Sequence, residues 1–130
     1  MTTQERMVQA LNWKRIGCNC AQAVLCAYED RLDLSTDTLK ALGAGFGGGM
    51  GTMEGTCGAL CAAEMVLGLT RFTGKPLGAS ARALHQDFAA RCGATLCREL
   101  KGRDTGVVLC PCPDCIQNAV ACLEDLLDNA

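Results

Sequence analysis

Cysteine is the residue type in this chain that is best able to do chemistry. The sequence has 11 cysteines in 130 residues, an odd number that cannot pair fully within one chain. The first 14 residues lack the apolar core of a signal peptide, so we expect a cytoplasmic protein whose thiols stay reduced. Metal binding, cluster binding or thiol redox chemistry is therefore favoured over a disulfide framework.

Three of the cysteines directly follow a residue that commonly caps a helix. The pairs are Asn19-Cys20, Thr56-Cys57 and Asp114-Cys115. Each cysteine is predicted at a first helical position, where free backbone N–H groups and the helix dipole favour a thiolate. If the helix starts converge, their N–H groups would surround the sulfurs. Such a cage suits an iron–sulfur cluster, whose potential depends on hydrogen bonds to sulfur, or a reactive dithiol.

Two further cysteines are secondary candidates as ligands. Cys112 precedes Cys115 in a C-x-x-C pattern, a spacing typical of redox or metal pairs. Ile116 follows this pattern in place of histidine, so no covalently attached haem is expected. Cys61 lies one helical turn after Cys57 and shares its face. Glu64 continues that face, where a carboxylate near thiols would relay protons or simply be solvated.

The glycine-rich segment "GAGFGGGMG" spans residues 43–51. Its first six residues match the dinucleotide pattern G-x-G-x-x-G, but that pattern requires a preceding strand, and a helix is predicted here. We expect these glycines to let the backbone pass close to another helix or to the sulfur site. His85, the sole histidine, lies on a predicted helix and lacks the partners that a hydrolase base requires.

The elements that must position these cysteines are predicted to be helices. Thr2-x-x-Glu5 resembles a capping box for a helix to about residue 15, and further helices are expected over about 20–31, 57–72 and 115–127. Period-2 alternation is nearly absent. The predicted fold is all-α: one domain over residues 1–130, a compact bundle of five to six helices with a glycine-rich loop.

Charge and hydropathy exclude two classes of partner. The net charge is −2 and no long basic run occurs, so nucleic acid is not expected. The longest apolar stretch, residues 57–69, is too short for a membrane span and contains Glu64, so no membrane association is expected.

Several blocks resemble the C-GCAxxG-C-C family, small bacterial and archaeal proteins described as redox-active. The blocks are "NCAQAVL" at 19–25, "GFGGGMG" followed by "GTCGALCAAEMVLGL" at 45–69, "CREL" at 97–100 and "CIQNAVACLEDLL" at 115–127. They cover nearly the whole chain. One departure is Ala62, which stands where the family motif has its last glycine.

The resemblance implies that Cys20, Cys57, Cys97 and Cys115 are the four family cysteines. Some family members carry selenocysteine at a cysteine position, which favours redox chemistry. The family is also similar to the non-haem part of split-Soret cytochrome c. That kinship implies a four-cysteine iron–sulfur site, with [2Fe–2S] favoured, and a homodimer.

The resulting hypothesis is a cytoplasmic redox-active protein with an unknown redox partner. Its four cysteines would ligate an iron–sulfur cluster for electron transfer or form reversible thiol/disulfide pairs. The alternative is a thiolate module that binds Cu(I) or Zn(II) without redox turnover. A nucleotide-dependent oxidoreductase and an interaction domain with inert cysteines rank below these.

Overall fold

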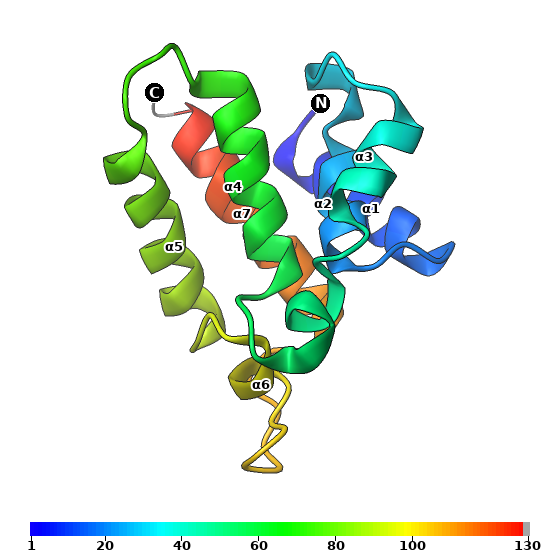
Figure 1. Cartoon of the computed structure of the whole chain (residues 1–130), viewed down its shortest axis with the longest axis vertical. Helices are drawn as coiled ribbons and strands as arrows, with labels where there is room; N and C mark the ends of the chain where they lie inside the picture. The colour runs from blue at the N-terminus through cyan, green and yellow to red at the C-terminus, as the bar shows by residue number, and fades with distance from the viewer. Residues whose placement is uncertain (129–130) are drawn as a thin grey trace.

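The computed structural model describes residues 1–128 and confirms an all-α fold (Figure 1). Within these residues there are seven α-helices, slightly more than the five to six expected, and no strand. The helices are α1 (Thr3–Arg15), α2 (Cys20–Ala27), α3 (Thr36–Gly43), α4 (Gly58–Arg71), α5 (Gly78–Cys92), α6 (Cys97–Leu100) and α7 (Cys112–Asp128). Two irregular elements add to them: the 3-10 turn η1 (Glu29–Arg31) and η2 (Gly49–Met53).

Two predicted helix starts are confirmed by their caps. Thr2 and Glu5 form a capping box at α1, and Asn19 forms one with Gln22 at α2. In each box a side-chain oxygen accepts the N3 amide while the N3 side chain accepts the cap residue's own amide. Cys20 is therefore the first residue of α2, as predicted.

The predicted start of the fourth helix at Cys57, with Thr56 as its cap, is wrong by one residue. Cys57 itself occupies the N-cap position of α4, so it is not a first helical residue. Thr56 is held instead in an isolated β-bridge with Leu96, and the Cys57 amide donates to the Thr95 carbonyl at 2.8 Å. This pairing keeps the backbone extended for one residue longer than the capping pattern indicated.

The predicted start of the last helix at Cys115 is wrong by three residues. Helix α7 begins at Cys112, and Cys115 already donates its amide to the Pro111 carbonyl at 2.9 Å. Pro113 is tolerated because the amide that it lacks would have no helical partner in a first turn. Cys112 therefore takes the first helical position that was predicted for Cys115.

Helix α2 lies at the centre of the molecule, which explains its composition. It packs against α1, α3, α4 and α7, and α7 also packs against α4 and α5. Because α2 is covered on several sides, seven of its eight residues are buried, and three of them are alanines that allow close approach. Its early end at Ala27, before the predicted residue 31, gives way to η1.

Figure 1 shows α6 below the lower ends of α4 and α7, where both helices begin. The glycine-rich segment lies at this end too. An added Cβ on Gly43 would come within 2.9 Å of the Gln22 amide nitrogen, and one on Gly49 within 2.6 Å of the Cys97 Cβ. These glycines do bring the backbone close to a helix and to a cysteine, as predicted. Among residues 1–128, no helix has both the length and the apolar composition needed to cross a bilayer.

Candidate functional site

Four cysteines from four separate elements line one cavity of about 220 Å³, here called the thiol cavity. The cysteines are Cys20, Cys57, Cys97 and Cys112. They come from the starts of α2, α4, α6 and α7, so two of the three helix-start cysteines considered in the sequence analysis, Cys20 and Cys57, meet here. Apart from the sulfurs, the wall of the cavity is almost wholly apolar. The remaining lining residues are Gly48, Met53, Gly58 and Lys101. The arrangement places several soft ligands around one largely apolar space.

Three of the four family cysteines line this cavity, and Cys115 does not. Cys115 is fully buried on α7, one turn after Cys112, and lies close enough to Cys57 for their sulfurs to interact. Lys101 donates to the Cys115 sulfur at 3.3 Å and to the Cys110 carbonyl at 3.1 Å. Cys115 is therefore in contact with two residues of the cavity wall, Cys57 and Lys101, whereas Cys112 lines the cavity itself.

The two secondary candidates differ in their surroundings. Cys112 is half-buried and lines the thiol cavity. Cys61 lies outside the lining and donates its thiol to the Thr56 carbonyl at 3.8 Å. Glu64 has one buried oxygen without a hydrogen-bond partner among the described residues, and burial raises its pKa to about 7.

Cys20 and Cys112 lie close enough to shift each other's acidity in opposite directions. The neighbouring Cys112 raises the pKa of Cys20, and burial raises it further. The neighbouring Cys20 lowers the pKa of Cys112, and Lys101 lowers it too, against the effect of burial. Cys112 is therefore the more acidic thiol of the pair.

Cys57 interacts with Cys115. The Cys115 sulfur and burial both raise the pKa of Cys57, although the amides of Ala59 and Leu60 lower it in part. These are the amides that a residue at an N-cap position faces. Burial also raises the pKa of Cys97. The pKa values of Cys20, Cys57 and Cys97 are thus all raised, and binding of a metal ion would have to displace the protons of these thiols.

Lys101 is the cation of the site. Burial lowers its pKa, but the nearby Cys115 and Cys112 raise it by more, so the ammonium stays charged. A fixed positive charge offsets the negative charge that ligating thiolates would bring together. No sequence pattern had indicated Lys101, because its role depends on the packing of α6 against the start of α7.

A second group of sulfurs was missed by the sequence analysis. Cys92, Cys110 and Cys115 are buried, and their sulfur atoms all lie within 4.8 Å of one another. Within residues 1–128 this is the one group of three or more histidine, cysteine or acidic ligands that meets that spacing. The three residues come from the end of α5, the loop after α6 and α7, so spacing along the chain gives no signal of their meeting.

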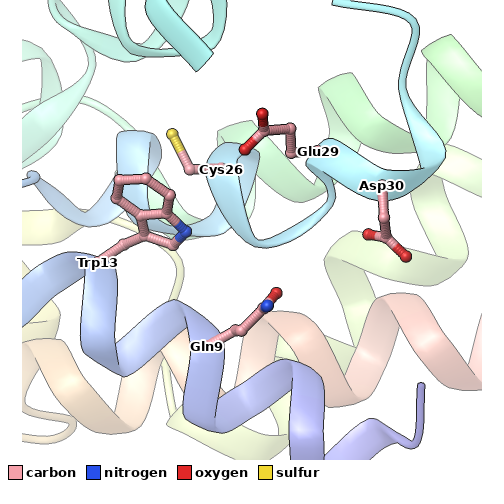
Figure 2. A pocket seen from close by; sticks show the side chains of 5 residues that line it. All are labelled: Gln9, Trp13, Cys26, Glu29 and Asp30. Carbon is pink, nitrogen blue, oxygen red and sulfur yellow. The ribbon is translucent and has the colours of Figure 1, made fainter. Parts of the chain in front are cut away.

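The surface pocket in Figure 2 has another character. It measures about 370 Å³ and lies at α1, the end of α2 and η1, with Gln9, Trp13, Cys26, Glu29 and Asp30 around it. Asp30 pairs with Arg6, and Glu29 accepts from Thr36 at 2.6 Å. Its acidic groups are therefore already engaged, and it offers a single thiol.

The fold and the two sulfur groups define a small all-α protein with a cysteine-lined interior. A family model described as "Putative redox-active protein (C_GCAxxG_C_C)" matches residues 18–126. The chain belongs to this family, as the sequence blocks indicated. No curated protein and no solved structure matches the chain. Family membership and the clustered cysteines together support a redox or metal-binding role.

Proposed function

We propose that this protein is a cytoplasmic electron-transfer protein that holds an iron–sulfur cluster, with [2Fe–2S] favoured, in the thiol cavity. The observation that carries the proposal is the meeting of four cysteines from four elements around one apolar cavity. Iron–sulfur clusters are bound by such sets of thiolates. When bound, the cluster would supply one-electron transfer to and from a partner protein.

The residues present fit such a group. Cys20, Cys57, Cys97 and Cys112 would hold it, and Cys115 stands behind Cys57 as the family cysteine nearest to the cavity. The wall of the cavity is largely apolar, and Lys101 would offset negative charge at the sulfurs. Gly49 lets η2 close against Cys97, which a larger residue would push aside. We further propose that the protein acts as a homodimer.

Purification without oxygen tests this proposal. Stoichiometric iron and acid-labile sulfide, with a visible absorption that bleaches on reduction, are expected for the wild-type protein. The variants Cys20→Ser and Cys57→Ser should lose iron and colour. Cys122→Ser, a buried cysteine on α7 outside both sulfur groups, is the matched control and should keep them. Colourless wild-type protein without iron would overturn the proposal.

The adjacency of Cys20 and Cys112 favours a second candidate, a reversible dithiol. The Cys112 sulfur would attack an oxidised partner, and Cys20 would then close a disulfide. Two thiols are oxidised, two protons leave, and the partner disulfide takes up the two electrons. Mass spectrometry of iron-free protein at graded thiol/disulfide ratios should then show a Cys20–Cys112 bond. Cys26→Ser is a control that should leave this bond intact.

The remaining alternative is that the cavity thiols bind Cu(I) or Zn(II) without redox turnover. Metal analysis of the same anaerobic preparation separates it from the first two. Zinc or copper in place of iron, with no change in metal content after reduction, is the result that would support it.

A further inference from the structure

We propose that the sulfur triad of Cys92, Cys110 and Cys115 is a separate binding site for one Cu(I) ion. The inference concerns a site other than the thiol cavity and does not rest on the iron–sulfur proposal. It starts from the sulfur atoms, which lie within 4.8 Å of one another. Metal–thiolate bonds are about 2.3 Å long, so sulfurs around one ion lie within roughly 4.6 Å of each other. Small side-chain rotations would bring all three onto one ion.

All three sulfurs of the triad accept hydrogen bonds from N–H groups, although the Cys115 thiol also donates to the Cys110 carbonyl at 3.4 Å. Asn118 Nδ2 donates to the Cys92 sulfur at 3.3 Å and to the Cys110 sulfur at 3.8 Å. Lys101 Nζ donates to the Cys115 sulfur at 3.3 Å. Each buried sulfur thus faces an N–H donor that would stabilise its thiolate form and orient it. A cysteine that merely fills an apolar core needs no such donor.

The number and softness of the ligands indicate the metal. Three thiolates with no fourth histidine, cysteine or carboxylate within the same spacing, among residues 1–128, leave zinc short of its tetrahedral set. Cu(I) prefers soft thiolate ligands and is satisfied by three of them. The Lys101 ammonium offsets part of the negative charge of such a complex.

A surface pocket of about 330 Å³ gives the ion a route to the triad that does not pass through the thiol cavity. Cys110 and Asn118 are part of its lining, together with Met7 and Asp114. The Met7 thioether is a soft group that suits a Cu(I) ion on its way in. Binding would release the thiol protons to solvent through the same opening.

Anaerobic titration of reduced, metal-free protein with Cu(I), against a chromophoric Cu(I) chelator, tests the site. To isolate the triad, the experiment uses Cys20→Ser/Cys97→Ser/Cys112→Ser, in which three of the cavity thiols are removed. This background should bind one Cu(I) per chain. Adding Cys92→Ser or Cys110→Ser should weaken binding at least 100-fold, while adding Cys122→Ser should leave it unchanged. Circular dichroism confirms that each variant is folded.

A measurement on the wild-type protein keeps the test decisive if a variant does not fold. With one equivalent of Cu(I), pulsed alkylation mapped by mass spectrometry should show Cys92, Cys110 and Cys115 protected together. Protection of the cavity cysteines alone, or Cu(I) affinity unaffected by Cys92→Ser and Cys110→Ser, would overturn the proposal. Zn(II) competing equally well for the same three residues would overturn the choice of metal. Iron content has no bearing on these outcomes, so the two proposals fail independently.

Discussion

At the residue scale, the position of Cys97 depends on a glycine that faces it. Gly49 has φ 61°, and an added Cβ would lie 2.6 Å from the Cys97 Cβ and 3.0 Å from the Gly55 carbonyl oxygen. That carbonyl accepts the Cys97 amide at 3.0 Å, so a shift of the loop would move the cysteine as well. The glycine therefore acts on the thiol cavity without contributing a ligand.

We expect Gly49→Ala to destabilise the protein and to displace Cys97. Gly51→Ala is the matched control, because Gly51 also has a positive φ, 78°, but an added Cβ there meets nothing within 4 Å. Both variants carry the left-handed backbone strain, so their difference isolates the clash. Chemical denaturation should show Gly49→Ala less stable than Gly51→Ala by about 1–3 kcal/mol. Equal stability of the two variants, with equal iron content, would show that Gly49 does not support the cavity.

The burial of the Glu64 carboxyl predicts how the free energy of unfolding changes with pH. Burial raises its pKa from 4.5 to about 7 in the folded protein. The folded state thus binds this proton more tightly than the unfolded state does. The contribution of Glu64 to the free energy of unfolding is therefore greatest below pH 4.5 and is lost as the pH rises through 7.

Glu64→Gln should remove that loss, because glutamine carries no charge to desolvate. We expect it to raise the free energy of unfolding by about 1–2 kcal/mol at pH 8, less than the full shift would give, since Glu64 is partly exposed and solvent screens it. At pH 4.5 the variant and the wild type should be about equally stable. Glu54→Gln, which changes the same charge at an exposed residue, is the control. A wild-type stability that rises between pH 5 and 8, with the same slope in Glu64→Gln, would contradict the assignment.

At the element scale, the cap residue of α2 also binds the glycine-rich segment. Asn19 accepts the Gln22 amide at 2.8 Å, and its Nδ2 donates to the carbonyls of Gly43 and Ala44 at 3.2 and 3.3 Å. An added Cβ on Gly47 would also collide with the Asn19 side chain. One residue therefore fixes the start of α2, which carries Cys20, and the path of the glycine-rich segment.

Asn19→Ala should cost about 1 kcal/mol of stability from the lost cap, and somewhat more from the released loop. Thr2→Ala removes the equivalent cap of α1, far along the chain from the cysteines, and is the matched control. Both should lower the denaturation midpoint, but only Asn19→Ala should increase the alkylation rate of Cys20 in reduced protein and lower its iron content. Identical thiol reactivity in the two variants would remove the link between the cap and the site.

The comparison of sequence and structure at this scale shows which features are local. The caps at Thr2 and Asn19 could be predicted because all their partners lie within three residues. The starts of α4 and α7 could not, because Thr56 pairs with the distant Leu96 and because Pro113 is accommodated within a first helical turn. The second of these shifts brings Cys112 to the first helical position that the sequence assigned to Cys115.

The meeting of the three triad sulfurs and the position of Lys101 depend on tertiary packing, so no local sequence pattern predicted them. Cys92 and Cys110 are separated by α6 and its following loop, and meet only where α5, that loop and α7 come together. The place of Cys20 at a helix start, by contrast, could be predicted because the cap residue Asn19 directly precedes it in the chain.

At the scale of the whole molecule, a polar network around the buried side chains of Arg6 and Glu124 joins α1, the end of α2, η1 and α7. Arg6 donates to the Ala27 carbonyl at 2.6 Å and pairs with Asp30 at 2.5 Å. Its Nε lies 4.0 Å from a carboxylate oxygen of the buried Glu124, and its guanidinium lies 4.4 Å from the Tyr28 ring centroid. Tyr28 donates to Glu124 at 3.0 Å. Because α2 and α7 also carry Cys20, Cys112 and Cys115, we expect this network to help hold in place the elements that build the site.

Arg6→Met should be strongly destabilising, because it leaves Glu124 buried without a positive charge beside it. A loss of about 3 kcal/mol is expected, as for other buried pairs from which one partner is removed. The double variant Arg6→Met/Glu124→Gln should recover part of this loss, since the uncompensated charge is then gone. Arg91→Met removes a surface arginine paired with Asp87 and Asp125, and should cost less than about 1 kcal/mol.

If the double variant were no more stable than Arg6→Met alone, the loss would come from packing of the arginine stem and not from the buried charge. A double-mutant cycle of urea denaturation distinguishes the two, and cysteine alkylation in the same variants shows whether the network positions the thiols of α2 and α7.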